Sequence, residues 1–87
     1  MLRSKQTISL PILITLKQNQ SFRLPELVDE LQVFSGCAWM TVAGQDIILN
    51  NQQIASIPHS KEGAIISPIG QEILILELRT KATSLIQ

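Results

Sequence analysis

The chain has 87 residues, in which seven basic side chains balance seven acidic ones and 45% of the residues are hydrophobic. This length predicts a single domain over residues 1–87 that buries roughly 60% of the surface its unfolded chain exposes. The balanced charge lacks the long-range attraction that a phosphate backbone or an anionic membrane requires, so neither nucleic acid nor a membrane is expected as a partner.

Turn-forming residues recur about every ten positions and separate short runs rich in Ile, Leu and Val. Aromatic residues make up only 3% of the chain, so branched aliphatic side chains must fill the core, which favours strands over helices. The sequence therefore predicts an all-β sandwich or barrel. In chain order, strands are expected at residues 7–16, 20–24, 31–35, 37–43, 46–50, 53–57, 63–67 and 72–79.

The first apolar run, residues 8–16, follows Arg3 and Lys5 and superficially imitates a signal peptide. Polar residues and Pro11 interrupt it, and no small-residue cleavage site follows. The single cysteine, Cys37, excludes an intramolecular disulfide and is typical of a reducing compartment, where it would fill a small buried position. These features predict a cytoplasmic protein.

One segment departs from the pattern of strands. Four apolar residues between Leu24 and Leu31 have the spacing of one helix face, and Pro25 suits a first helical turn. Residues 31–33 then alternate as a half-buried strand does. We therefore expect at most one short helical turn, between Pro25 and Glu30.

Residues 16–25 align with residues 49–58 at an offset of 33, sharing a leading leucine, a central glutamine and a closing aliphatic-proline pair. Gly36 and Gly70 follow one position out of step, and each precedes a run of strand character. This faint repeat predicts two similar strand-turn-strand units that face each other and cover each other's apolar surface.

The runs from Ile12 to Ile14 and from Ile73 to Leu76 are apolar at consecutive positions, although strand side chains alternate between faces. Both faces of these strands should therefore be covered, which a small barrel cannot achieve alone. We expect self-association into a homodimer through these strands. Pro11 lacks an amide donor and suits an edge strand or a bulge.

The middle of the chain carries the pattern Leu31-x-Val33-x-x-Gly36-x-x-Trp39-x-Thr41, followed by Asp46, Leu49 and an aliphatic-proline strand end. Over a third to a half of the chain, this resembles a family of small, uncharacterised bacterial cupin-like domains with a G-x-x-W-x-T core. The resemblance implies a double-stranded β-helix, or jelly-roll, barrel and no activity, since the family has none assigned. Where that family tends to carry a turn glycine, this chain has Asn50-Asn51-Gln52, and asparagine tolerates a left-handed backbone.

Cupin enzymes usually hold a metal with two or three histidines and a carboxylate, but His59 is the only histidine here. Its neighbours, Pro58 and Ser60-Lys61-Glu62-Gly63, predict a solvated turn, with ligand contact as the alternative. Glu62 and Glu72 are the other carboxylate candidates, and both lie in turn-like sequence. No catalytic residue, metal site or cofactor is predicted, because no nucleophile is matched with a general base.

Trp39 is the main candidate for recognition. Its ring would stack on a flat ligand such as a sugar, with Thr41 on the same face and Gln45 or Asp46 offering polar contacts. In a core of aliphatic residues, however, a lone tryptophan is expected to be the largest packing element. On that interpretation Trp39→Ala costs about 3 to 5 kcal/mol of stability.

Three functions remain open. A non-catalytic cupin-like module that binds a small molecule or a protein partner is favoured. The alternatives are an enzyme with a diverged, possibly metal-free cupin site and a structural homodimerisation domain. A pocket lined by His59 and two carboxylates would favour the enzyme, an apolar interior would favour the module, and a solidly filled barrel is what the structural domain predicts.

Overall fold

Eight strands make up the fold, which a computed structural model describes for residues 10–80. Each predicted strand is present, and the largest difference is at the first, which begins directly after Pro11; residues 7–9 of that prediction lie outside the described residues. The strands are β1 (Ile12–Leu16), β2 (Phe22–Leu24), β3 (Glu30–Ser35), β4 (Ala38–Val42), β5 (Gln45–Leu49), β6 (Ile54–Ser56), β7 (Ala64–Pro68) and β8 (Leu74–Arg79).

Residues 10–80 contain no helix, and therefore none that is long and apolar enough to cross a membrane. The segment in which a helical turn was expected is a single tight turn, where the Val28 amide donates to the carbonyl oxygen of Pro25 at 3.1 Å. Val28 is buried while Leu27 is exposed, so the apolar spacing anchors one side of a loop and does not extend into a helix. β3 then begins at Glu30.

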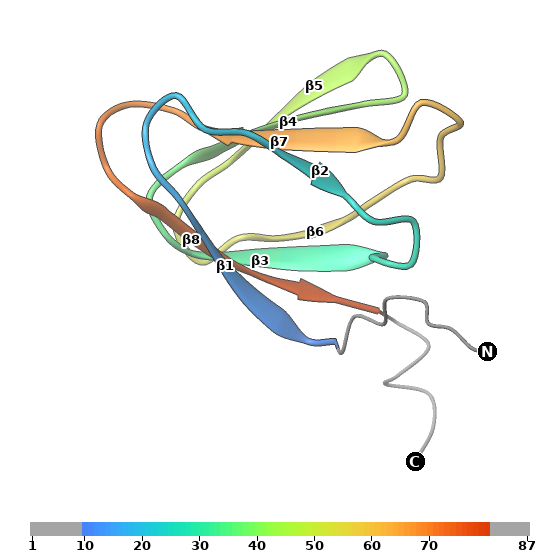
Figure 1. The fold of residues 1–87 in the computed structure, drawn as a ribbon, viewed down its shortest axis with the longest axis horizontal. Helices are drawn as coiled ribbons and strands as arrows, with labels where there is room; N and C mark the ends of the chain where they lie inside the picture. Colours follow the sequence, from blue (N-terminus) through green and yellow to red (C-terminus); the bar gives the residue numbers. More distant parts are fainter. Residues whose placement is uncertain (1–9, 81–87) are drawn as a thin grey trace, which may run out of the picture.

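Two four-stranded sheets face each other, with the strand orders β1-β8-β3-β6 and β2-β7-β4-β5 (Figure 1). All neighbouring strands are antiparallel. No strand belongs to both sheets, so the predicted all-β class is confirmed but the described strands do not close into a barrel.

The chain runs as one long hairpin folded at its middle. Only β4 and β5 are both consecutive and paired, and every other connection crosses between the sheets. Ala43 and Gly44 form the turn between them with φ of 53° and 74°, as a two-residue type I′ hairpin requires. From this turn outward, β3 pairs with β6, β2 with β7 and β1 with β8.

The internal repeat corresponds to two matching turns, one between β1 and β2 and the other between β5 and β6. In the first, the Gln20 amide donates to the Lys17 carbonyl oxygen at 3.0 Å, and the Lys17 amide donates to Oε1 of Gln20 at 2.7 Å. Gln53 and Asn50 make the same two bonds at the same distances in the second. The glutamine shared by both halves therefore closes each turn twice, through its backbone and its side chain.

The equivalence extends to the backbone and the topology. Asn19 and Gln52, the third residues of the two turns, have φ of 70° and 72°, so a glutamine and not an asparagine is left-handed in the second turn. The strand orders of the two sheets are equivalent as well. Adding four to each strand number, with the count returning to β1 after β8, converts β1-β8-β3-β6 into β5-β4-β7-β2, which is the second sheet read in reverse. The two halves of the chain are thus related by an approximate twofold axis that exchanges the sheets.

Aliphatic side chains fill the space between the sheets. β8 shows the pattern most clearly, because Leu74, Leu76 and Leu78 are almost completely buried and the residues between them face outward. No polar or charged side chain among the described residues is buried. The buried hydrophobic residues of the described range are Leu16, Leu24, Val28, Leu31, Val33, Ala38, Met40, Val42, Leu49, Ala64, Ile66, Leu74, Leu76 and Leu78.

Gly36 lies between β3 and β4, against the start of β8. Its φ is +85°, and a Cβ atom there would lie 2.7 Å from the carbonyl oxygen of Ile73, a backbone atom that cannot move independently. Gly44 has a similar φ of +74° but nothing within 4 Å of its added Cβ. The two glycines thus separate the cost of a left-handed conformation from the cost of a close backbone contact.

We expect Gly36→Ala to lower the free energy of unfolding by about 3 kcal/mol or more, because a steric clash adds to the left-handed strain. Gly44→Ala should cost only about 1 kcal/mol, since strain alone acts there. Urea denaturation of the two variants measures this difference. Equal losses would show that Gly36 does not depend on its contact with Ile73.

The two matching turns allow a paired test. Gln20→Ala and Gln53→Ala should each lower the free energy of unfolding by about 0.5–1.5 kcal/mol, because each removes one side-chain hydrogen bond from an equivalent turn. Gln20→Glu and Gln53→Glu keep the acceptor oxygen and should lose less. Gln18→Ala, at an exposed neighbour in the first turn, is the control for urea denaturation, and a loss as large as that of Gln20→Ala would contradict the assignment.

Candidate binding surface

Trp39 lies on the outside of the molecule, which corrects the expectation that its ring is the largest element of the core. In β4, Ala38, Met40 and Val42 point inward and are buried, so Trp39 and Thr41 point to solvent, and Trp39 is 45% exposed. Strand side chains alternate, and only one of the two sets can face the core. The uniformly apolar set, Ala38-Met40-Val42, was the signal in the sequence that identified the inward face.

Trp39 is at the centre of a continuous outer face on the sheet β2-β7-β4-β5. It lies opposite Ile48 on β5 and Ser67 on β7, while Thr41 lies opposite Asp46 and Ile65. Ile48 and Ile65 are 52% and 40% exposed. Arg23 on β2, opposite Ile65, completes the second row. We call the seven outward residues of this sheet the Trp39 face: Arg23, Trp39, Thr41, Asp46, Ile48, Ile65 and Ser67.

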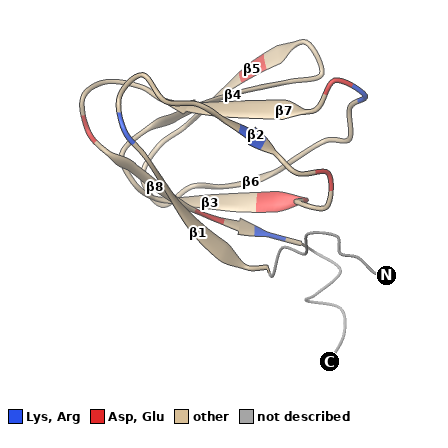
Figure 2. Ribbon diagram, in the orientation of Figure 1, with Lys and Arg blue, Asp and Glu red and all other residues tan. Residues whose placement is uncertain are grey.

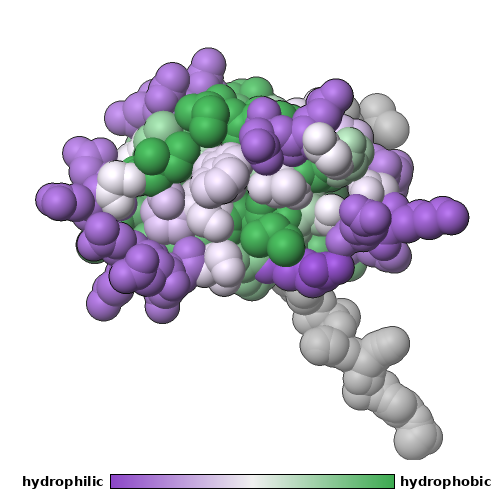
Figure 3. All heavy atoms as spheres, turned by 90° about the horizontal axis from the view of Figure 1, so that it is seen from above, coloured by the Kyte–Doolittle hydropathy of each residue, from purple (hydrophilic) through white to green (hydrophobic). Residues whose placement is uncertain are grey.

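The Trp39 face combines an apolar centre with charged edges. Figure 3 looks down on this sheet and shows separate hydrophobic patches among residues of intermediate hydropathy, with strongly hydrophilic residues mainly toward the ends. Figure 2 shows a basic position on β2, an acidic one on β5, and neither on the two strands between them. Three of the four predicted contact residues, Trp39, Thr41 and Asp46, are thus brought together, and Thr41 Oγ1 donates to Asp46 Oδ1 at 3.4 Å.

A shallow groove of about 370 Å³ runs beside Trp39, and the turn between β1 and β2 forms one of its walls. Its residues bear mainly amide and hydroxyl groups, a composition suited to hydrogen bonding. Sequence reasoning missed this neighbourhood, because the turn and β4 are distant in sequence and meet only through the strand order. The groove is lined by Gln18, Asn19, Gln20, Ser21, Trp39, Ser67, Pro68 and Gly70.

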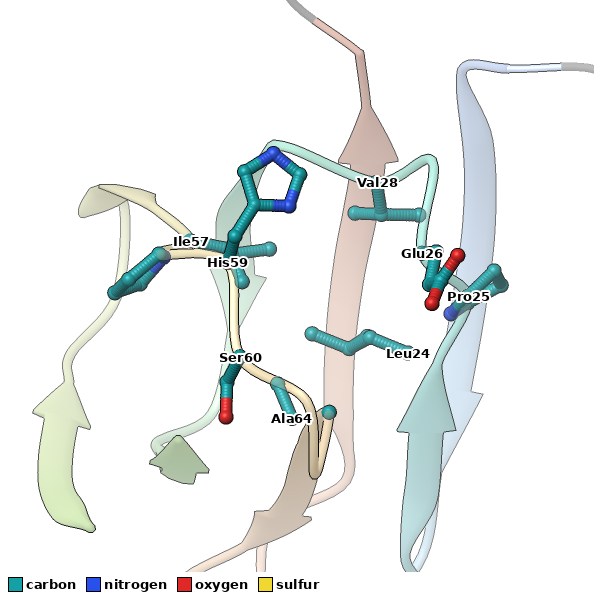
Figure 4. A pocket seen from close by; sticks show the side chains of 10 residues that line it. Leu24, Pro25, Glu26, Val28, Ile57, His59, Ser60 and Ala64 are labelled. Atoms are coloured by element: carbon teal, nitrogen blue, oxygen red, sulfur yellow. The ribbon is translucent and has the colours of Figure 1, made fainter. Parts of the chain in front are cut away.

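His59 lies elsewhere, in the exposed loop after β6, as its turn-like context predicted. It borders a hollow at one end of the sandwich whose lining includes Glu26 but not Trp39, Thr41 or Asp46 (Figure 4). The hollow measures about 40 Å³, room for a few water molecules, whereas small-molecule sites span roughly 300–1,000 Å³. Among residues 10–80, no group of three or more His, Cys, Asp or Glu side chains could hold a metal ion.

The opposite sheet carries a different outer face. Arg79 donates from Nε to Oε1 of Glu77 at 2.8 Å, from Nη1 to Oε2 of Glu30 at 3.0 Å, and from Nη2 to Oε1 of Gln32. The hydrogen bond with Glu77 is the main reason why the pKa of Arg79 lies above its usual value, so the guanidinium stays charged. One cation therefore faces two carboxylates at one end of the inner strands β3 and β8.

The apolar runs predicted to form a homodimer contact divide between the core and the surface. Leu74 and Leu76 are buried, while Ile12, Leu13 and Ile73 are exposed. β1 is an edge strand that begins after Pro11, as expected for a residue without an amide donor. Cys37 is half-buried rather than buried, and its Sγ lies 3.4 Å from Oδ1 of Asn50.

Comparisons of the chain with protein-family models, with curated proteins and with solved structures found no match.

Because Trp39 is exposed, its substitution should destabilise the protein less than the sequence suggested. Trp39→Ala should lower the free energy of unfolding by about 1 kcal/mol, because much of the ring already contacts water. Met40→Ala, at the buried neighbour, should cost about 2–5 kcal/mol. Urea denaturation compares them, and tryptophan fluorescence of the unsubstituted protein should show the red-shifted, readily quenched emission of a hydrated indole. A greater loss at Trp39 than at Met40 would contradict the outward orientation.

Proposed function

We propose that the chain is a non-catalytic, cupin-like jelly-roll module that binds a partner protein through the Trp39 face. Two features support the jelly roll. The strand orders β1-β8-β3-β6 and β2-β7-β4-β5 are those expected of an eight-stranded double sheet built from two Greek keys. The approximate twofold axis between the halves is typical of a double-stranded β-helix, in agreement with the G-x-x-W-x-T resemblance.

One observation is the main support for binding at the surface: the interior is filled by aliphatic residues, while the only tryptophan lies outside. A cupin-type site requires polar side chains that converge inside the sandwich, and the buried residues include none among those described. A ligand must therefore bind to the outer surface of the sandwich, where Trp39 offers the largest apolar contact area.

The chemistry of the Trp39 face favours a protein over a small molecule. Tryptophan is the residue type most enriched at interaction hot spots, and fully buried interface centres are apolar with a polar rim. Ile48 and Ile65 beside Trp39 extend the apolar surface across three neighbouring strands, β5, β4 and β7. The groove supplies fewer free hydrogen-bonding groups than its composition suggests, because Oε1 of Gln20 already accepts from the Lys17 amide.

Site-specific photo-crosslinking tests this function. A benzophenone amino acid would replace Ile48 on the Trp39 face or, as the matched control, Thr15, an exposed residue on the outer face of the other sheet. In cells that make the protein natively, illumination should yield a protein adduct from position 48 and none from position 15. Adducts from position 15 alone, or none from either position, would overturn the proposed binding face.

A further inference from the structure

We infer that the protein bound at the Trp39 face is a second copy of this chain, related by a twofold axis that runs parallel to the strands between β4 and β7. This inference rests on the proposed function, because it names the occupant of the same surface. It follows from the positions of charges and of large and small side chains on the face, which are complementary to themselves under that rotation.

The charges of the Trp39 face lie at its two opposite edges. Asp46 is on the edge strand β5 and Arg23 is on the edge strand β2, with β4 and β7 between them. Neither residue forms an ion pair with another residue of the described range, since both ion pairs found there involve Arg79. The guanidinium of Arg23 is held by a neutral group, the Glu62 carbonyl oxygen, to which Nη2 donates at 2.6 Å.

A twofold axis along the strands places β5 of one copy over β2 of the other. Two rows of cross-strand neighbours run across the sheet, and the rotation acts within each row. In the row that contains Thr41, it sets Arg23 of one copy opposite Asp46 of the other, twice per dimer. Arg23 and Asp46, which have no ion-pair partner within the described residues, thus pair with each other across the rim of the interface. Such pairs favour one specific alignment of the two subunits.

The side-chain sizes follow the same rule. The rotation sets Trp39 opposite Ser67 of the second copy and Ile65 opposite Thr41, so each large side chain faces a smaller one. Facing sheets pack about 10 Å apart with interdigitated side chains, which requires this alternation of large and small. The resulting interface has an apolar centre and a charged rim, and both subunits contribute the same residues.

The outer face of the other sheet does not fit a second copy in this way. At one end of its two inner strands it holds Arg79 with Glu30 and Glu77, a cluster of net charge −1 that is already paired within the chain. Stacking two such faces would oppose like net charges and remove paired ions from water. Leu13, opposite Glu77, lies on this outer face and belongs with the exposed Ile12 and Ile73 to the surface through which self-association was predicted from the sequence.

Sedimentation equilibrium on the full chain tests the inference by charge complementation. The unsubstituted protein should form a dimer, and Arg23→Glu or Asp46→Lys alone should raise the dimer Kd about tenfold or more, because each sets like charges opposite each other. An equimolar mixture of the two variants should dimerise again, since each substituted position then meets an opposite charge. The rescue should weaken at high salt. Lys17→Glu, with the same charge change off the face, is the control and should leave the Kd unchanged.

A second pair of variants addresses the apolar centre. Trp39→Ala should raise the dimer Kd about tenfold or more, while Leu13→Ala, on the outer face of the other sheet, should leave it unchanged. A monomer at every concentration, a failure of the mixture to dimerise, or weakening by Leu13→Ala alone would each overturn the inference. A crosslinked adduct at position 48 with a different protein would overturn the inference while leaving the proposed function in place.

Discussion

The two-residue turn at Ala43 and Gly44 determines the register on which the rest of the structure depends. Among the eight described strands, it joins the only two that are neighbours both in sequence and in a sheet, and every pair of the β4–β5 ladder follows from it. Because strand side chains alternate, a slip by one residue would turn Met40 to solvent and Trp39 to the core. The positive φ of both turn residues thus decides which side chains form the interior and which form the Trp39 face.

The two outer faces of the sandwich use charge in opposite ways. On one sheet, Arg79 pairs with two carboxylates at one end of the inner strands β3 and β8, so these charges are paired within the chain. On the other, the centre is apolar and the opposite charges, Arg23 and Asp46, lie on edge strands too far apart to meet. The first arrangement stabilises an isolated molecule, and the second leaves both apolar surface and electrostatic attraction available to a partner.

Much of the fold could be predicted from the sequence, because turn residues and short aliphatic runs are local signals. The eight strands and the repeat followed from such signals, and the shared glutamine of the two turns proved to have a direct structural role. The predicted inward orientation of Trp39 was wrong. It relied on the size of the side chain and overlooked that Ala38, Met40 and Val42, the alternate residues of β4, are all apolar. The lack of barrel closure among the described strands and the groove beside Trp39 could not be predicted, since both depend on contacts between distant segments. His59 was expected in a solvated turn and lies in the exposed loop just before one, the turn from Ser60 to Gly63, but its separation from Trp39 depends on the strand order alone.

β8, the last of the described strands, occupies an interior position in its sheet. β8 lies between β1 and β3, and β7 likewise separates β2 from β4 in the second sheet. A ribosome therefore releases β1 to β6 before either sheet can assemble, because the strands that join the early ones are made after them. Until β7 and β8 are made, β1 and β2 lack partners for their backbone amides, so no shorter N-terminal stretch of this domain can reach the native topology.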